Sequence, residues 1–212
     1  MSMFTDPKVQ SVFETYSARA EQEKEQMGRE GFKGRDNFLL PIGIDVGRVL
    51  HSLILARKPN RILEIGTSYG YSTLFLADAA KTIGAKMITL DLADYKQAYA
   101  QDMMSKAGLV DSVEFRQGDA VELIQNDPGP FDFVLLDIWK SLYVPCFDAV
   151  YPKLSDEGII AADNMYYPAG TLEYTRLYRQ AVLDKPDLQT TLLSMGSGVE
   201  LTSKWPANSE KL

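Results

Sequence analysis

The sequence is poor in the residues that build disulfides and zinc sites. It contains one cysteine, Cys146, and one histidine, His51, in 212 residues. A single cysteine excludes an intramolecular disulfide, and one residue of each kind excludes a metal site rich in Cys or His ligands.

Excess positive charge and long apolar runs are absent as well. Lys and Arg number 22 against 29 Asp and Glu, a formal charge of −7. Nucleic acids require a basic face, so neither DNA nor RNA is an expected partner, and no basic membrane-surface helix is indicated. No stretch reaches the roughly 18 apolar residues of a membrane span, and residues 1–10 lack the apolar core of a signal peptide. We expect a soluble cytoplasmic protein.

The composition that remains is typical of one globular domain over residues 1–212, with 45% hydrophobic and 24% charged residues. Apolar residues at helical spacing predict a helix over 9–27, whose acids Glu21, Glu23 and Glu25 should form a solvated surface. The glycine-rich residues 28–37 predict a loop, and a second helix is predicted over 43–57.

From residue 61 onward, strand and helix patterns alternate. Short apolar runs predict strands over 61–65, 87–92, 113–117, 131–137 and 158–163. Helical patterns follow or separate them over 72–84, 95–108, 120–125, 143–154 and 172–184. The last two strands, 188–196 and 199–205, meet at a Gly-Ser-Gly turn and predict an antiparallel hairpin. This order predicts an α/β fold with a mostly parallel sheet.

A glycine motif follows the first predicted strand. Its glycines, Gly66 and Gly70, are spaced G-x-x-x-G rather than as the dinucleotide fingerprint G-x-G-x-x-G. Glu64 precedes them, and its carboxylate would oppose a pyrophosphate but suit a cationic group such as an amino-acid ammonium. The alternative is a tight turn that binds no ligand.

Asp91 ends the second predicted strand. An acid at this position can accept hydrogen bonds from both hydroxyls of a nucleoside ribose, which does not separate NAD from S-adenosylmethionine. The alternative is a helix cap formed by Asp91 or Asp94.

Three oxygen-bearing side chains end the fourth and fifth predicted strands: Asp137, Asp163 and Asn164. The carboxyl ends of parallel strands share one edge, and two carboxylates with an amide oxygen suit a hard cation such as Mg²⁺. Lys140 follows Asp137 by three residues and could act there as a general base. The alternatives are helix caps for the acids and an exposed ion pair for the lysine.

Three segments together resemble the metal-dependent catechol and caffeoyl-CoA type O-methyltransferases: LEIGTSYGYSTLFLA (63–77), LDIWKSLY (136–143) and AADNMYYPAG (161–170). The matching order and spacing extend from Phe38 to Lys204. The resemblance implies a Rossmann-like, doubly wound seven-stranded sheet with a C-terminal antiparallel hairpin. It also implies S-adenosylmethionine (SAM) as methyl donor and a divalent cation, Mg²⁺ or another such as Ca²⁺ or Mn²⁺.

The resemblance also implies roles for individual residues. Asp137, Asp163 and Asn164 would hold the metal, and Lys140 would be the catalytic base. The cofactor would be lined by Ile42, Glu64, Gly66, Thr67, Ser72, Asp91, Asp119, Ala120, Asp137 and Trp139. An aromatic acceptor would contact Trp139, Tyr166, Tyr167 and Pro168.

Three positions depart from the family pattern. Asp91 stands where the catechol enzymes have Glu, and Ile138 stands where they have a histidine against the adenine. The carboxylate that clamps the second catechol hydroxyl has no counterpart, since the nearest aligned residue is Thr191. The acceptor is therefore less well defined than the chemistry.

The resulting hypothesis is a metal-dependent O-methyltransferase acting on an aromatic vicinal diol. A catalytically idle SAM-binding module and a nucleotide-dependent oxidoreductase are the alternatives, and the oligomeric state is open, a homodimer included. We also expect residues 1–36 to cover the acceptor pocket. Phe32 and Phe38 would supply an apolar wall, and Gly31 and Gly34 would let the loop move.

Overall fold

The structure, a computed structural model, describes residues 2–30 and 35–205. Its α-helices are α1 (Pro7–Glu30), α2 (Ile44–Arg57), α3 (Tyr71–Ile83), α4 (Asp94–Ala107), α5 (Ala120–Asn126), α6 (Tyr143–Val150) and α7 (Leu172–Leu183). Its strands are β1 (Arg61–Ile65), β2 (Lys86–Asp91), β3 (Val113–Gln117), β4 (Phe131–Leu136), β5 (Leu154–Ala162), β6 (Leu188–Leu193) and β7 (Val199–Lys204). Short 3₁₀ turns are η1 (Arg35–Asn37), η2 (Val110–Ser112), η3 (Lys140–Leu142), η4 (Tyr151–Lys153) and η5 (Ala169–Thr171).

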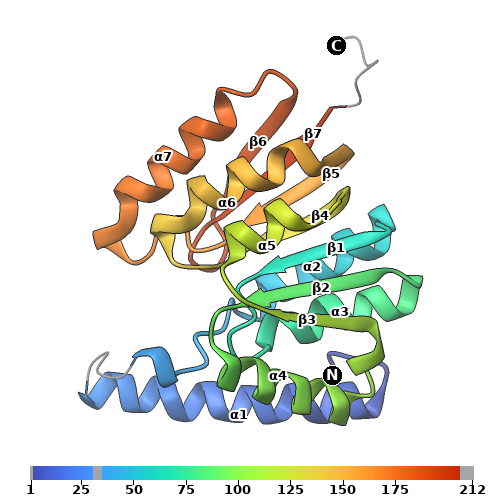
Figure 1. Cartoon of the computed structure of the whole chain (residues 1–212). Coiled ribbons are helices and arrows are strands. Elements are labelled where there is room, and N and C mark those ends of the chain that lie inside the picture. The colour runs from blue at the N-terminus through green and yellow to red at the C-terminus, as the bar shows by residue number, and fades with distance from the viewer. Residues whose placement is uncertain (1, 31–34, 206–212) are drawn as a thin grey trace.

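One seven-stranded sheet runs through the molecule in the order β3-β2-β1-β4-β5-β7-β6 (Figure 1). Strands β1 to β5 pair in parallel, and β7 is antiparallel to both of its neighbours. This confirms the predicted parallel sheet with a C-terminal antiparallel hairpin. The order reverses between β1 and β4, so the chain leaves these adjacent strands in opposite directions, as in a doubly wound fold.

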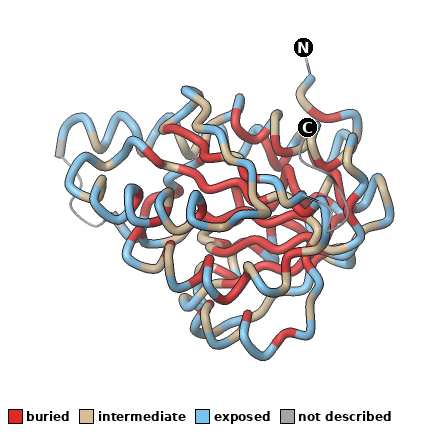
Figure 2. Tube along the Cα trace, turned by 90° about the horizontal axis from the view of Figure 1, so that it is seen from above, coloured by how far each residue is buried: buried red, intermediate tan, exposed pale blue. Residues whose placement is uncertain are grey.

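Two apolar cores cover the two faces of the sheet. One contains buried residues of α1, α2, α3 and α4, and the other those of α5, α6 and α7. Figure 2 shows the buried residues gathered along the strands, with exposed residues on the surrounding helices and loops. Alternate strand residues serve opposite faces, which explains why the central strand β4 is apolar at nearly every position.

The N-terminal helix α1 packs on the molecule rather than extending from it. Val9, Val12 and Tyr16 are buried in the core that α1 shares with α3 and α4. The Tyr16 hydroxyl donates a hydrogen bond of 2.6 Å to the Tyr69 carbonyl, in the glycine motif. Deletion of α1 would expose this core and destabilise the protein. An activity assay on such a truncated variant could not separate a lost function from a lost fold.

Some boundaries differ from the sequence prediction. Helix α1 continues through Gly28, Arg29 and Glu30, which were predicted as loop. Helix α6 ends at Val150, and β5 begins at Leu154, four residues earlier than predicted. Leu154 pairs with Phe131 before a register shift, and this bulge separates it from the regular pairing that starts at Ile159.

The prediction for Glu23 was wrong. Its carboxylate is not solvated: it accepts hydrogen bonds from Arg19 Nε and from the Leu39 backbone N–H, both at 2.6 Å. Glu21 and Glu25 do lie on the exposed surface. Of the residues expected in a mobile wall, Phe38 is buried, whereas Gly31, Phe32 and Gly34 lie outside the described residues.

None of the helices within the described ranges is both long enough and apolar enough to cross a membrane.

Candidate functional site

The site lies where the loops after β1 and β4 meet. Gly66 follows β1 with φ +106°, and a Cβ atom there would lie 2.0 Å from the Asp137 carbonyl oxygen. The Asp137 N–H in turn donates to the Ile65 carbonyl at 3.0 Å. Glycine is therefore required at position 66, because only a backbone without a side chain lets the two loops touch. This junction is the topological switch point, the usual ligand crevice of such a sheet.

Asp137, Asp163 and Asn164 meet at this edge, as predicted, around the Lys140 ammonium. Lys140 Nζ lies 3.9 Å from Asp137 Oδ1, 3.3 Å from Asn164 Oδ1 and 3.2 Å from the Asp163 carbonyl oxygen. The Asp163 N–H donates to the Leu136 carbonyl at 3.1 Å, which ties the end of β5 to the end of β4. Asn164 has the left-handed φ of +55°, a conformation uncommon for a non-glycine residue.

The Asp163 carboxylate is buried and poorly satisfied. Both of its oxygens are buried, and neither accepts a hydrogen bond from a described residue. Burial, and after it the charge of Asp137, raise the pKa of Asp163 to about 7, against the smaller opposing effects of the Asn164 backbone N–H and the Lys140 ammonium. Burial also raises the pKa of Asp137, which the Lys140 ammonium opposes. Among the described residues, the Lys140 ammonium is the one positive charge within reach of these two carboxylates, and the two Asp163 oxygens are left poorly satisfied.

The donor set fits a hard cation. Two carboxylates and an amide oxygen match the preference of Mg²⁺ or Ca²⁺, and a cation would satisfy the two Asp163 oxygens. Within the described ranges, no cluster of three or more His, Cys, Asp or Glu side chains could hold a metal. A metal here would therefore depend on Asn164 and on oxygens from water or substrate.

Tyr143 holds Lys140 in place, and the sequence analysis did not identify it. The ammonium of Lys140 donates to the Tyr143 hydroxyl, and that hydroxyl donates to the Asp163 carbonyl at 2.7 Å. Tyr143 is fully buried, and burial, followed by the charges of Asp137 and Asp163, raises its pKa well above the ordinary value. The available signal was its position three residues after Lys140, one helical turn away.

Glu64 lies beneath the glycine motif and has no exposed surface. Its carboxylate accepts three hydrogen bonds of 2.6 Å, from the hydroxyls of Ser72, Thr73 and Thr89. Burial raises the pKa of Glu64 to about 7 against the effect of these hydrogen bonds. The structure thus places Glu64 and Ser72 together, but it encloses the carboxylate among hydroxyls. Direct contact with a ligand ammonium stays a prediction.

Asp91 connects the second strand to the glycine motif. One carboxylate oxygen accepts the Ser68 N–H at 2.7 Å and the other accepts the Ala93 N–H at 2.9 Å. It is not the N-cap of α4, a position that Ala93 occupies. Asp119 is a helix cap, since it accepts the Glu122 N–H at 3.0 Å at the start of α5, beside buried Ala120. Ligand roles for these residues remain predictions.

Three exposed aromatic residues lie within three positions of the site residues in the sequence. Trp139, Tyr166 and Tyr167 are 60%, 46% and 46% exposed, and Tyr167 precedes Pro168. The hairpin turn before β7 positions Tyr166, whose N–H donates to the Ser197 carbonyl at 2.8 Å. A Cβ atom at Gly198 would lie 2.4 Å from the Tyr166 ring, so glycine is needed there. Large aromatic groups left in contact with solvent are typical of a ligand surface.

A segment from η1 to α2 crosses the same edge of the sheet. At one end, Asp36 accepts hydrogen bonds from Tyr95 and Lys96 of α4 at 2.6 and 2.5 Å. At the other end, the carbonyl of buried Ile42 lies 3.4 Å from the Cβ position of Gly196, in the hairpin turn. The segment therefore passes from the β2 side of the edge to the β7 side.

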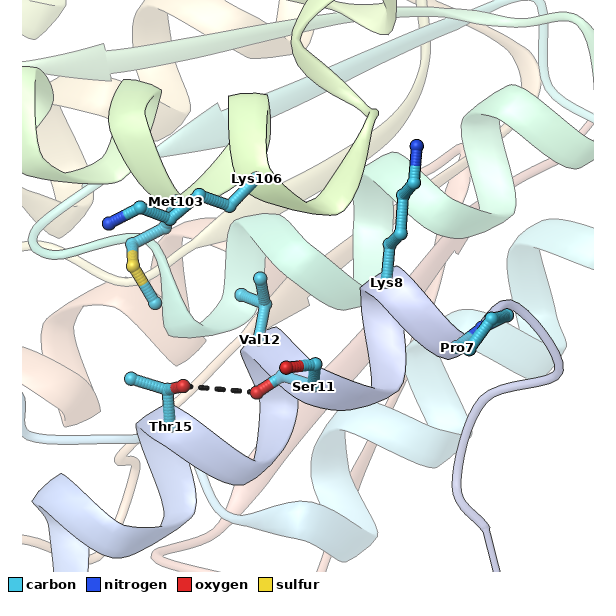
Figure 3. A pocket seen from close by; sticks show the side chains of 7 residues that line it. All are labelled: Pro7, Lys8, Ser11, Val12, Thr15, Met103 and Lys106. Atoms are coloured by element: carbon cyan, nitrogen blue, oxygen red, sulfur yellow. Dashed lines mark hydrogen bonds between the residues drawn. The ribbon is translucent and has the colours of Figure 1, made fainter.

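Two cavities lie outside this junction. One, of about 410 Å³, is a groove between α1 and α4, whose side chains face each other across it in Figure 3. Met103 and Lys106 place it near the end of α4, away from the start of α4 beside Asp91. The other, of about 240 Å³, lies between Tyr166, α7 and Leu192, adjacent to the aromatic surface. Only the second borders the candidate site.

Comparison with known proteins identifies the family. The O-methyltransferase family profile matches residues 14–204. A catechol O-methyltransferase of Niastella koreensis is 36% identical over 124 residues, which cover 56% of this chain and 55% of that protein. Caffeoyl-CoA O-methyltransferase 5 of Nicotiana tabacum is 25% identical over 218 residues, with coverages of 93% and 90%.

A solved structure shares the fold. The O-methyltransferase from Bacillus cereus was solved in complex with S-adenosylhomocysteine (SAH) and has a TM-score of 0.77 at 22% sequence identity. The match covers 95% of this chain and 92% of the Bacillus cereus chain. Its low identity supports the architecture alone, whereas the family profile extends over most of the sequence, from α1 to the end of β7. The chain therefore belongs to the O-methyltransferase family.

Proposed function

We propose that this protein is a divalent-metal-dependent enzyme that moves the methyl group of SAM to a hydroxyl of a catechol-like or caffeoyl-like aromatic vicinal diol. The observation that carries the proposal is the unpartnered Asp163 carboxylate beside Asp137, Asn164 and Lys140. Such a group is costly unless a ligand satisfies it. Family membership supports the methyl transfer, and the names of the two relatives support a phenolic acceptor.

The metal would be held by Asp137, Asp163 and Asn164. When bound, a divalent cation supplies Lewis acidity, which lowers the pKa of a coordinated phenol from its ordinary value of about 10. Lys140, on the same edge, would take the remaining phenol proton in its neutral amine form, after releasing a proton to solvent; the charges of a bound metal and sulfonium would favour that form. Trp139, Tyr166, Tyr167 and Pro168 would hold the aromatic ring in the orientation required for attack and exclude water from one side.

The methyl donor would occupy the switch point above Gly66. When bound, SAM supplies a methyl group on a positively charged sulfur, and the nearby carboxylates favour that charge. Ile42, Glu64, Gly66, Thr67 and Ser72 would surround the amino-acid end. Asp91 would bind the ribose, Asp119 and Ala120 would border the adenine, and Asp137 and Trp139 would flank the sulfonium. A related protein crystallised with SAH supports this class of ligand.

A methyl-transfer screen tests the proposal. Catechols, caffeoyl esters and flavonoids should be assayed with labelled SAM, with and without a chelator. We expect turnover of at least one vicinal diol, and none of the matching monophenol, because only the diol offers two adjacent oxygens to a cation. Binding of SAH without any turnover across the screen would instead indicate the idle SAM-binding module.

Asp91 provides a test of the cofactor site. We expect Asp91→Ala to weaken SAH binding by about 1.5–3 kcal/mol, the range for hydrogen bonds to a charged group. Calorimetry measures this directly. Asp94→Ala is the matched control, since Asp94 starts α4 nearby and is exposed. If the dissociation constant of SAH is unchanged in Asp91→Ala, Asp91 serves only to accept the backbone hydrogen bonds of Ser68 and Ala93.

We also propose that the segment from η1 to α2 covers the acceptor side of the site. Its support is the path already described, from Asp36 at α4 to Ile42 at the hairpin turn. Glu23 anchors this segment to α1 through the Leu39 N–H. The aromatic surface formed by Trp139, Tyr166 and Tyr167 needs a second wall, and this segment is close enough to the hairpin turn to supply it.

Glu23→Ala should loosen that cover. We expect the Michaelis constant of the acceptor to rise about two- to tenfold, because the net contribution of one such hydrogen bond is about 0.5–1.5 kcal/mol. The dissociation constant of SAH should not change. Glu21→Ala is the control: Glu21 is exposed on the same helix and lies 3.9 Å from Lys24. Equal kinetics in both variants would contradict a covering role.

A further inference from the structure

A buried polar network lies beneath the glycine motif and contains residues with no assigned role. It joins Glu64 of β1, Thr67 of the following loop, Thr89 of β2 and Gln97 of α4. All four side chains are at least nine-tenths buried. Polar groups in such a position are stabilising only when every one is satisfied, so the direction of each hydrogen bond matters.

The orientation of the Gln97 amide follows from its surroundings. Its nitrogen lies 3.1 Å from the Arg116 carbonyl and 3.3 Å from the Thr89 carbonyl. Carbonyl oxygens only accept hydrogen bonds, so the NH₂ group and not the amide oxygen must face them. The same nitrogen also lies 3.1 Å from Thr67 Oγ1, and because its two hydrogens face three acceptors, one hydrogen is shared between two of them.

The directions of the other hydrogen bonds follow from Glu64, at the opposite end of the network. Thr89 Oγ1 donates to Glu64 Oε2 at 2.6 Å, the only direction open to it when the Glu64 carboxylate is ionised. The Thr89 hydroxyl has no second hydrogen, so Thr67 donates to Thr89 across their 2.6 Å contact. The hydrogen bonds therefore run one way, from Gln97 through Thr67 and Thr89 to Glu64.

This chain of hydrogen bonds ends at the residues that would surround the amino-acid end of the methyl donor. Thr67 belongs to the glycine loop, and the other oxygen of Glu64 accepts from Ser72 at 2.6 Å in the first turn of α3. Thr89 and Gln97 lie behind this layer, on β2 and α4. Rotation of either side chain would remove a donor from Thr67 or from Glu64, and the Ser72 and Thr73 hydroxyls alone would then hold the Glu64 carboxylate.

We propose that Thr89 and Gln97 are positioning residues, which fix Thr67, Glu64 and through it Ser72 for binding the amino-acid end of the methyl donor. The inference rests on the proposed SAM-dependent function. It predicts that loss of these hydrogen bonds weakens the binding of ligands that carry the amino-acid end. The binding of ligands that lack this end should not change. A purely structural role would weaken both kinds alike or neither.

Two ligands separate these outcomes: SAH, which has the amino-acid end, and 5′-methylthioadenosine, which lacks it. We expect Thr89→Val to weaken SAH about tenfold, close to the 1.4 kcal/mol of one hydrogen bond to a charged group, and to leave methylthioadenosine within about twofold. Thr89→Ser keeps the hydroxyl and should restore SAH affinity. Titration calorimetry gives all of these constants, and methylthioadenosine binding also reports a folded site.

Gln97→Leu should weaken SAH in the same selective way, and Gln101→Leu, exposed one turn later on α4, should not. Because both residues act along one chain, the double variant should bind SAH no more weakly than Thr89→Val alone. Unchanged SAH affinity in Thr89→Val, or equal losses for both ligands, would overturn the inference. A wild-type protein that binds neither ligand would contradict the proposed function itself, and this inference with it.

Discussion

Excess chelator should abolish methyl transfer by this protein, and Mg²⁺ should restore it. The expected loss is at least about 100-fold, because the cation would stabilise the developing negative charge on the acceptor oxygen in a site with little water. Asp163→Asn should reproduce the loss in the presence of Mg²⁺. The same variant should keep its affinity for SAH, which is expected to contact other residues. Initial rates with labelled SAM and calorimetry with SAH measure both quantities.

Stability provides a second readout of the metal site. In wild type, Mg²⁺ should raise the melting temperature, since a ligand that binds only the folded state stabilises it. Asp163→Asn should remove that response, yet without metal the variant should be no less stable than wild type. The reason is that the substitution removes a buried charge whose oxygens have no partner. Asp156→Asn, exposed on the same strand, is the control and should keep the response to Mg²⁺. Full activity in excess chelator would refute the metal assignment.

The part of the site that could be predicted is the part set by strand ends. Gly66, Asp137 and Asp163 each follow a strand whose apolar run is clear in the sequence, and parallel strands end at one edge. Their meeting therefore follows from local pattern plus topology. Strands β1 and β3 have the predicted bounds for the same reason. The start of β5 was missed because Ser155, Asp156 and Glu157 interrupt its apolar pattern.

The residues that were missed depend on packing between distant elements. Glu23 bonds Leu39 across 16 residues, and Gln97 reaches Thr67 across 30. Both positions look like ordinary polar helix residues, because helical periodicity does not specify which polar side chain faces another element. Thr89 is similarly hidden, since a threonine in a strand is favoured by its shape alone. The enclosure of Glu64 could not be read from its position in the motif.

Lys140→Met should lower kcat about 10²- to 10⁴-fold, the usual contribution of a general base. Lys140 is almost fully buried, and Tyr143, Asn164 and the Asp163 carbonyl fix its ammonium within the acidic group. Loss of its positive charge should not weaken a cation held by Asp137 and Asp163, so Mg²⁺ and SAH should still bind. Lys86→Met, exposed at the start of β2, is the control and should retain full activity.

Lys140→Arg separates the two roles that the lysine could have. Arginine keeps the positive charge but cannot accept a proton from a phenol near neutral pH. If Lys140 is the base, Lys140→Arg should be as impaired as Lys140→Met; if only its charge matters, Lys140→Arg should recover most of the rate. A nitrocatechol is already largely ionised at pH 8, so with this acceptor the loss in Lys140→Met should shrink, because little proton removal remains. Equal losses for catechol and nitrocatechol, together with an active Lys140→Arg variant, would show that Lys140 acts through its charge and not as a base.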